Sequence, residues 1–324
     1  MNAWARTRDT GLHNVHVHCK QTAVTMARRV LITGASGLLG RAVYKEFLSD
    51  ASWEVLGLAF SRASGNLRKV DITSNDELNK VFDDFKPQVV IHSAAERKPD
   101  AVEKQPEATR RLNIDATRHI CELAVKTGAW VLYISTDYVF DGKNPPYNED
   151  ASTNPLNKYG VSKRDGELVT LEVSKDNGVL RVPILYGDVQ NLDESAVTIL
   201  FDKVKDTGHK CIMNDYERRF PTHCADIAVV IRQLSDKKLQ DASIGGIYHW
   251  SGDENMTKYD MAVAMATALG ISTSHIEADK NPSVGATRPY NANVGCNRVE
   301  SLGFGRRTPF KDGIVPVLSP FVIK

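Results

Sequence analysis

From Arg29 onward the chain alternates short apolar runs with amphipathic stretches, and this alternation limits the possible folds more than any other feature of the sequence. Strands that are apolar throughout and separated by helices are typical of a parallel sheet covered by helices on both faces. We therefore expect an α/β chain with a doubly wound parallel sheet. The pattern predicts strands at residues 29–33, 54–60, 67–71, 88–93, 129–135, 179–185 and 246–250, and helices at 38–48, 76–85 and 256–269, with a long helical region that ends at Lys126.

The 324 residues divide into three parts. Residues 1–27 contain a single acidic residue, Asp9, and no apolar run of the kind that a secretory signal requires, so we expect a disordered extension. Residues 28–186 carry the regular alternation and form the predicted nucleotide-binding domain. Residues 187–324 are less regular, and we expect a smaller lobe from which some segments return to the sheet.

Charge and composition exclude several classes of protein. The 41 lysine and arginine residues nearly balance the 40 aspartate and glutamate residues, which argues against a nucleic-acid partner held by bulk electrostatics. No segment approaches the roughly 20 apolar residues that a membrane-spanning helix needs. The five cysteines include no Cys-x-x-Cys pair, so we predict reduced thiols and no metal site. We accordingly expect a cytoplasmic protein, with the nucleus as an alternative.

A glycine-rich turn joins the first predicted strand to the first predicted helix. It reads Gly34-Ala-Ser36-Gly37-Leu38-Leu39-Gly40. In a turn without Cβ atoms the backbone N–H groups approach a pyrophosphate closely, and the helix N-terminus adds partial positive charge. Because the motif follows an apolar strand and opens a helix, it predicts a dinucleotide site in a Rossmann-type domain. A tight turn that binds nothing is the alternative.

The end of the second predicted strand indicates which dinucleotide is bound. An NAD site places Asp or Glu about 20 residues after the glycines, on the ribose hydroxyls. Here the sequence is Phe60-Ser61-Arg62, with no acid. A guanidinium at Arg62 can pair with a 2′-phosphate, so we predict NADP(H); an ordinary solvated arginine is the alternative.

Tyr159 and Lys163 stand four residues apart, which places both side chains on one face of a helix. We expect the ammonium of Lys163 to lower the pKa of the Tyr159 phenol toward the working range of a proton donor. Thr136 lies at the carboxyl end of the fifth predicted strand, where ligands of doubly wound sheets bind. A Thr136 hydroxyl could hold a substrate carbonyl while Tyr159 donates a proton and the cofactor donates hydride. The three residues therefore predict a reductase site.

These motifs resemble the extended short-chain dehydrogenase/reductase family over nearly the whole chain from residue 28. Within that family, Ser135-Thr-Asp-Tyr-Val-Phe-Asp-Gly142 and Asn154-Pro-Leu-Asn-Lys-Tyr-Gly160 are similar to the dTDP-4-dehydrorhamnose reductase branch. Further segments resemble the beta regulatory subunits of eukaryotic methionine adenosyltransferase: Ala94-Ala-Glu-Arg-Lys-Pro-Asp-Ala-Val-Glu103, Arg219-Phe-Pro-Thr-His223, His249-Trp-Ser-Gly252 with Met256-Thr-Lys-Tyr259, and Gly303-Phe-Gly-Arg-Arg-Thr-Pro-Phe310. The resemblance implies a reductase fold that is non-catalytic, binds NADP and associates with the catalytic subunit that makes S-adenosylmethionine, altering its kinetics.

The same resemblance implies where the nucleotide lies. Asp71 and Ile72 would lie at the adenine, and Leu185 at the nicotinamide end. Members of the regulatory family continue past the position of Lys324 with a short tail implicated in partner contact, and the absence of such a tail would put that docking mode in doubt. The full set of implied nucleotide contacts is Ser36, Gly37, Leu38, Leu39, Phe60, Ser61, Arg62, Asp71, Ile72, Ser93, Arg97, Tyr159, Lys163 and Leu185.

Two principal functions remain open. A regulatory, NADP-binding subunit accounts for the resemblance outside the reductase motifs, which catalysis would not require. An NADPH-dependent reductase of a nucleotide-linked 4-keto-6-deoxy sugar accounts for Thr136, Tyr159 and Lys163, all of which are present. A sugar-nucleotide epimerase is a third and weaker alternative, because no motif in the smaller lobe specifically indicates it.

Overall fold

The computed structural model describes Met1 and residues 27–322, so nearly all of the predicted extension 1–27 lies outside the described residues. The strands in the described part are β1 (Arg28–Thr33), β2 (Trp53–Ala59), β3 (Arg68–Lys69), β4 (Val89–His92), β5 (Trp130–Thr136), β6 (Gly178–Val182), β7 (Leu185–Tyr186), β8 (Cys211–Asn214), β9 (Thr222–His223), β10 (Gly246–His249) and β11 (Ile276–Asp279). The α-helices there are α1 (Leu38–Leu48), α2 (Asn75–Phe85), α3 (Pro99–Lys104), α4 (Pro106–Arg110), α5 (Ala116–Thr127), α6 (Lys158–Val173), α7 (Phe201–Val204), α8 (Cys224–Lys238), α9 (Lys258–Ala268), α10 (Asn297–Ser301) and α11 (Phe310–Leu318).

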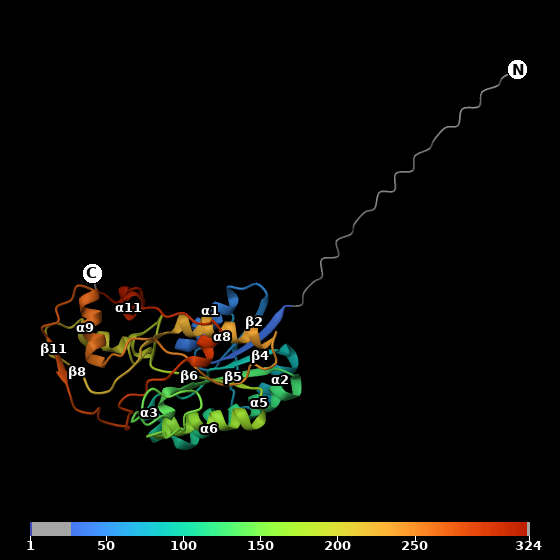
Figure 1. Ribbon diagram of the computed structural model, residues 1–324, viewed down its shortest axis with the longest axis horizontal. Coiled ribbons are helices and arrows are strands. Elements are labelled where there is room, and N and C mark those ends of the chain that lie inside the picture. The colour runs from blue at the N-terminus through green and yellow to red at the C-terminus, as the bar shows by residue number, and fades with distance from the viewer. Residues whose placement is uncertain (2–26, 323–324) are drawn as a thin grey trace.

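Seven of these strands form one sheet, in the order β10-β6-β5-β4-β1-β2-β3 (Figure 1). Every neighbouring pair in this sheet is parallel. The chain starts in the middle at β1, moves outward through β2 and β3, and then crosses to β4 on the other side of β1. The predicted doubly wound α/β fold is therefore confirmed. The crossing point beside β1 is where open sheets of this kind bind ligands.

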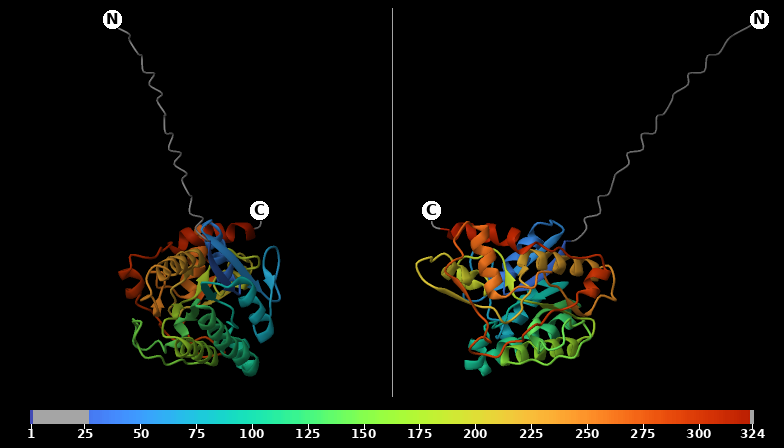
Figure 2. Two further views of the ribbon diagram at one scale, coloured as in Figure 1. Left: turned by 90° about the vertical axis from the view of Figure 1, so that its right-hand side faces the viewer. Right: turned by 60° about the vertical axis from the view of Figure 1, so that its left-hand side comes forward.

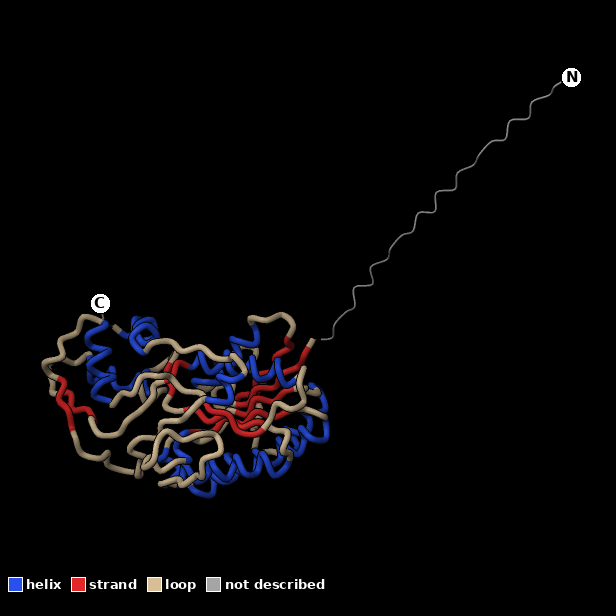
Figure 3. Tube along the Cα trace, in the orientation of Figure 1, coloured by secondary structure: helices blue, strands red, loops and turns tan. Residues whose placement is uncertain are grey.

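Helices cover both faces of the sheet, as the blue and red segments of Figure 3 show. Helices α1 and α8 pack against each other on one face and lie side by side in Figures 1 and 2. Helices α2, α5 and α6 cover the other face (Figure 1). Each strand residue faces one layer or the other, so all seven residues of β5 are buried.

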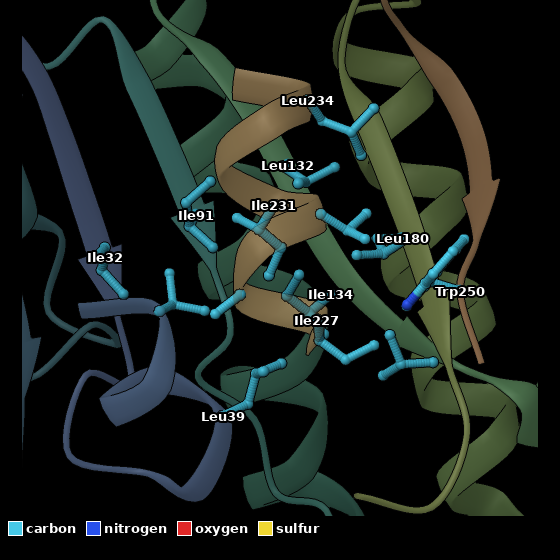
Figure 4. Packing of buried hydrophobic residues seen from close by; sticks show 14 of the residues in the cluster. Ile32, Leu39, Ile91, Leu132, Ile134, Leu180, Ile227, Ile231, Leu234 and Trp250 are labelled. Atoms are coloured by element: carbon cyan, nitrogen blue, oxygen red, sulfur yellow. The ribbon is translucent and has the colours of Figure 1, made fainter. Parts of the chain in front are cut away.

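The core between the sheet and α8 joins parts of the chain that are far apart in the sequence (Figure 4). Ile227, Ile231 and Leu234 of α8 lie over Leu132 of β5 and Leu180 of β6. All five side chains are fully buried, and each such burial contributes about 1.5–3 kcal/mol. This packing holds the carboxyl ends of the central strands in place.

The long helical region predicted to end at Lys126 is not one continuous helix, so that prediction was wrong. Helices α3 and α4 are short and each begins at a proline, Pro99 and Pro106. Proline is favoured at the first helical position, where its missing N–H costs nothing, but it ends any helix that precedes it. A π-helical turn, Arg111–Asp115, then leads into α5.

Two strand predictions also differ from the structure. The strand expected at 179–185 ends at Val182, because Pro183 has no N–H to donate to a ladder. The chain resumes as β7, which pairs in parallel with β9 outside the main sheet. The strand expected at 67–71 is reduced to the two residues of β3 at the sheet edge.

The remaining segments form a second apolar cluster at the carboxyl edge of the sheet. Its members include Tyr186, Phe201, Met265 and Phe310, all fully or almost fully buried. Strands β8 and β11 form a separate parallel pair there. Helix α9 begins at a capping box, in which the Thr257 side chain accepts from the N–H of Asp260 and the Asp260 carboxylate accepts from the N–H of Thr257.

Among residues 27–322, no helix combines the length and apolar character that crossing a membrane requires. Nor does the described part of the chain bring together three or more His, Cys, Asp or Glu side chains in a way suited to a metal ion.

Candidate functional site

A cavity of about 490 Å³ lies at the carboxyl edge of the main sheet. The ends of β1, β2, β4, β5 and β6 supply its floor, so it occupies the place where open α/β sheets bind ligands. The structure brings every predicted site residue to this one cavity. They are Gly34, Ser36, Gly37, Leu38, Leu39, Gly40, Phe60, Ser61, Arg62, Asp71, Ile72, Ser93, Arg97, Thr136, Tyr159, Lys163 and Leu185.

The glycine turn needs its glycines for reasons of space. Gly34 has a φ of +68°, and a Cβ on it would lie 2.9 Å from the Cα of Ala94. A Cβ on Gly40 would lie only 2.0 Å from the carbonyl oxygen of Gly34. The third glycine thus lets α1 pack directly on the turn.

The N-terminus of α1 faces the cavity without a side-chain cap. Gly37 is the N-cap and forms no side-chain hydrogen bond, and the first turn contains no acidic residue. Its backbone N–H groups therefore keep hydrogen-bonding capacity and the partial positive charge of the helix end. Together with Arg62 and Arg97 in the lining, this end of the cavity has the donor set that a pyrophosphate or a phosphate monoester requires. The residues present fit a phosphorylated dinucleotide.

The segment after β2 carries a cation where an NAD site carries an acid. Phe60 is exposed on the cavity rim, and Ser61 and Arg62 follow it. The Arg62 side chain is half exposed, and its Nη1 lies 2.6 Å from Oε1 of Glu194. Arg62 is thus already held by a carboxylate, while its remaining N–H groups are free to meet a ligand.

Thr136, Tyr159 and Lys163 line the same cavity from β5 and α6. Thr136 is the last residue of β5, and Tyr159 and Lys163 stand one turn apart on α6. The helix is fixed at its start by Asn157, whose side chain accepts from the N–H of Gly160 at 2.8 Å. The Lys163 Nζ lies 4.1 Å from the centre of the Tyr133 ring, a favourable cation–π distance.

The expected effect of Lys163 on Tyr159 was wrong. Burial raises the pKa of the Tyr159 phenol well above its ordinary value, although a hydrogen bond with Thr136 opposes the rise. Burial also lowers the pKa of Lys163 to about 7, against the opposing charge of Glu167. A half-neutral ammonium is a weak stabiliser of phenolate, so desolvation outweighs the expected attraction. Without a bound ligand, the Tyr159 phenol therefore stays protonated at neutral pH.

Asp137 is a member of the site to which the sequence assigned no role. It is buried beside Thr136, and the Thr136 hydroxyl donates to its Oδ1 at 3.0 Å. Burial raises the pKa of Asp137 to about 6, although the nearby charge of Arg219 lowers it. The signal was available in the Ser135-Thr-Asp137 motif at the strand end, but the sequence does not say which way the hydroxyl points.

Glu194 is a second residue that sequence reasoning missed. It lies between β7 and α7, and its side chain is only 7% exposed. Oε2 accepts from Nη2 of Arg41 at 2.6 Å and Oε1 from Nη1 of Arg62 at 2.6 Å. The carbonyl oxygen of Glu194 also accepts from Nη2 of Arg97 at 2.6 Å. In the sequence this residue follows Asn, Leu and Asp, and nothing distinguishes it from an exposed acidic loop residue.

Residues 28–323 match the family described as RmlD substrate binding domain. Methionine adenosyltransferase 2 subunit beta of Bos taurus is 48% identical over 98% of this chain and 96% of its own length. The same subunit of Xenopus tropicalis is 50% identical over 95% of this chain and 92% of its own. The dTDP-4-dehydrorhamnose reductase of Aggregatibacter actinomycetemcomitans is 34% identical over 73% and 78%, respectively.

Solved structures show the same architecture. The dTDP-4-dehydrorhamnose reductase of Bacillus anthracis, solved in complex with NADP, superimposes with a TM-score of 0.80 at 26% identity. The alignment covers 91% of this chain and 100% of that one. The corresponding protein of Clostridium acetobutylicum gives a TM-score of 0.77 at 27% identity, with the same coverage.

Proposed function

The chain belongs to the RmlD-type family of extended short-chain dehydrogenase/reductases, as a homologue of methionine adenosyltransferase 2 subunit beta, and from this membership we propose that it is a regulatory subunit. In this proposal it binds NADP(H) and associates with the catalytic subunit of methionine adenosyltransferase, modulating S-adenosylmethionine synthesis. It acts in the cytoplasm, with the nucleus as an alternative, and it is not itself the catalyst. We further propose that the chain divides into an extension 1–27, a Rossmann domain 28–186 and a smaller lobe 187–324.

One observation carries the proposal. The similarity to the beta subunits spans 98% of this chain at 48% identity, whereas the similarity to a bacterial reductase spans 73% at 34%. A shared cofactor cavity and reductase motifs account for similarity around the cavity alone. Similarity over the rest of the chain supports a shared outer surface, and therefore a shared protein partner.

Association is tested directly by mixing the full chain with a methionine adenosyltransferase catalytic subunit. We expect the two to co-elute in size-exclusion chromatography at micromolar concentrations and the kinetics for methionine to change. The Bacillus anthracis reductase serves as the control, since it has the same fold and should neither co-elute nor change the kinetics. Independent elution of this chain with unchanged kinetics would contradict the regulatory proposal.

The proposed cofactor is supported by the donor set at the glycine turn and by Arg62. When bound, the nicotinamide supplies a hydride; in a regulatory subunit this chemistry is idle and the nucleotide serves as a structural ligand. Arg62 and Arg97 would hold phosphate groups, and the N-terminus of α1 would face the pyrophosphate. Asp71 and Ile72 line the part of the cavity proposed for the adenine, and Leu185 the part proposed for the nicotinamide.

Replacing Arg62 with alanine should affect NADP affinity and NAD affinity differently. A charge-assisted hydrogen bond to a phosphate contributes about 1.5–3 kcal/mol, so we expect Arg62→Ala to weaken NADP binding about 10- to 100-fold. NAD lacks the 2′-phosphate, and its affinity should change by less than about twofold. Isothermal titration of both nucleotides measures the ratio.

A matched control is Arg68→Ala, which removes an arginine on the neighbouring strand that pairs with Asp84 and does not line the cavity. Equal losses of NADP and NAD affinity in Arg62→Ala would show that Arg62 does not recognise the 2′-phosphate.

The second candidate function is reduction of a nucleotide-linked 4-keto-6-deoxy sugar. It is favoured by Thr136, Tyr159 and Lys163 lining one end of the same cavity. In that reaction Tyr159, which keeps its proton at neutral pH, would donate it to the carbonyl oxygen. NADPH oxidation in the presence of dTDP-4-dehydrorhamnose, abolished by Tyr159→Phe, would establish this function. Under the regulatory proposal no such oxidation is expected.

A further inference from the structure

One wall of the cavity is a strap from the C-terminal part of the chain, which we define as residues Asp188–Ala196. The strap follows β7 and contains the 3-10 turn Leu192–Glu194. Its last two residues, Ser195 and Ala196, line the cavity. The Ser195 hydroxyl donates to the carbonyl oxygen of Leu185 at 2.7 Å, which fixes that end of the strap to β7.

The other end of the strap is held to the glycine turn through Arg41 on α1. Nη1 of Arg41 donates to the carbonyl oxygen of Ser36 at 2.9 Å, and Nη2 donates to that of Asp188 at 2.9 Å. The same guanidinium pairs with the Glu194 carboxylate at 2.6 Å. Arg41 therefore connects two parts of the cavity wall that are about 150 residues apart in the chain.

Glu194 is the point at which these contacts converge. Arg41 from α1, Arg62 after β2 and Arg97 after β4 all donate to it, two to the carboxylate and one to the backbone oxygen. The N–H of Gln190 adds a further bond to Oε2 at 3.1 Å. Helix α1, the β2–β3 connection and the β4–α3 connection are thus joined to the strap through a single residue.

The electrostatics keep this residue charged. Burial by itself would raise the pKa of Glu194, but hydrogen bonds from Arg41 and the Gln190 N–H, with the charges of Arg41 and Arg62, hold it below its ordinary value. The carboxylate is nearly buried, whereas Arg62 is half exposed. The acid is therefore the fixed partner and the cavity arginine the movable one.

We propose that Glu194 is a positioning residue that keeps the strap closed against the glycine turn and so controls how fast NADP(H) leaves the cavity. The inference rests on the proposed use of this cavity by NADP(H). Glu194 does not line the cavity; it acts through the strap and through the arginines. Without its carboxylate, Arg41 keeps only its bond to the Asp188 carbonyl as a link to the strap, Arg62 loses its anchor, and the segment that leads to the cavity-lining Ser195 and Ala196 is held less tightly against the glycine turn.

The test is the dissociation rate of bound NADPH, followed by its fluorescence after mixing with excess NADP. We expect Glu194→Ala to raise the rate constant at least about tenfold, because changes within one binding site act mainly on dissociation. Glu194→Gln should raise it less, about threefold, since its amide keeps an acceptor oxygen but loses the charge. NADH should also dissociate faster, because the strap covers the part that both nucleotides share, but by a factor no larger than that for NADPH, because Arg62 meets only the 2′-phosphate.

Three variants separate this role from a general loss of stability. Asp193→Asn changes the exposed neighbouring acid and should leave the rate as it is. Arg41→Ala combined with Glu194→Ala should raise the release rate by less than the product of the two single factors, since the ion pair between the two residues is lost in either variant. Arg62→Ala should raise the dissociation rate of NADPH more than that of NADH.

Several results would overturn the inference. One is a Glu194→Ala rate within twofold of the wild type; another is a fully additive effect of the Arg41 and Glu194 replacements. A wild-type chain that binds neither NADPH nor NADH would instead contradict the proposed cofactor itself. Normal wild-type binding with unchanged release in the variants would contradict the strap alone.

Discussion

Gly40→Ala is expected to abolish NADP(H) binding within the measurable range, a loss of at least about 100-fold. The added Cβ would lie 2.0 Å from the carbonyl oxygen of Gly34 and 2.9 Å from the Cα of Ala35, so the backbone of the turn must move. A turn displaced in this way no longer presents its N–H groups, or the N-terminus of α1, to a pyrophosphate. The loss would act on NADP and NAD alike, unlike that of Arg62→Ala.

The same replacement should lower stability. Forcing an extra carbon into a closely packed site costs about 1–3 kcal/mol or more, which in a chain of this size lowers the unfolding temperature by roughly 2–4 °C. Nucleotide titration and thermal unfolding measure the two effects. Gly208→Ala is the matched control, because the nearest atom to its added Cβ is a side-chain oxygen of Asp206 at 3.5 Å. A Gly40→Ala protein that binds normally would show that the turn does not carry the cofactor.

Glu167→Gln is expected to destabilise the fold by about 3–5 kcal/mol. Glu167 on α6 forms two bonds to Arg181 on β6, at 2.9 and 2.7 Å, and both side chains are less than 5% exposed. Ser135 also donates to the Glu167 carboxylate. Removing the negative charge leaves the Arg181 guanidinium buried without a counter-ion, and this desolvated charge is the source of the cost.

The same helix supplies the control. Glu172, also on α6, pairs with Arg118, but both side chains are more than 40% exposed. An exposed pair contributes little, so Glu172→Gln should change stability by less than about 1 kcal/mol. Urea unfolding followed by tryptophan fluorescence compares the two. Equal, small changes would indicate that water reaches Arg181 and replaces the lost partner.

The features that could be predicted from the sequence have local signals. The strand around Leu31, the glycine turn and the start of α1 follow one another within some twenty residues, and each has a pattern that depends only on its neighbours in the chain. Tyr159 and Lys163 likewise carry their spacing in the sequence. These local signals were sufficient to predict the parallel sheet and the residues that line the cavity.

The features that could not be predicted depend on contacts between distant segments. Glu194 acquires its meaning only from Arg41 and Arg62, which are 153 and 132 residues away. The pairing of β7 with β9 joins two-residue strands whose patterns are too short to recognise. The pKa of Tyr159 depends on how completely α6 is covered, which no spacing of residues reveals.

The packing of α8 also bears on how the protein is made on the ribosome. The apolar face of β5 and β6 is complete when Val182 has been synthesised, but the helix that covers it extends from Cys224 to Lys238. At a synthesis rate of about 5–20 residues per second, that face stays exposed for several seconds until α8 has been synthesised. The nascent chain therefore passes through a stage in which a nearly complete sheet is open to water, and it is then that a chaperone would be needed. A fragment that ends before α8 would leave this apolar face permanently exposed to water.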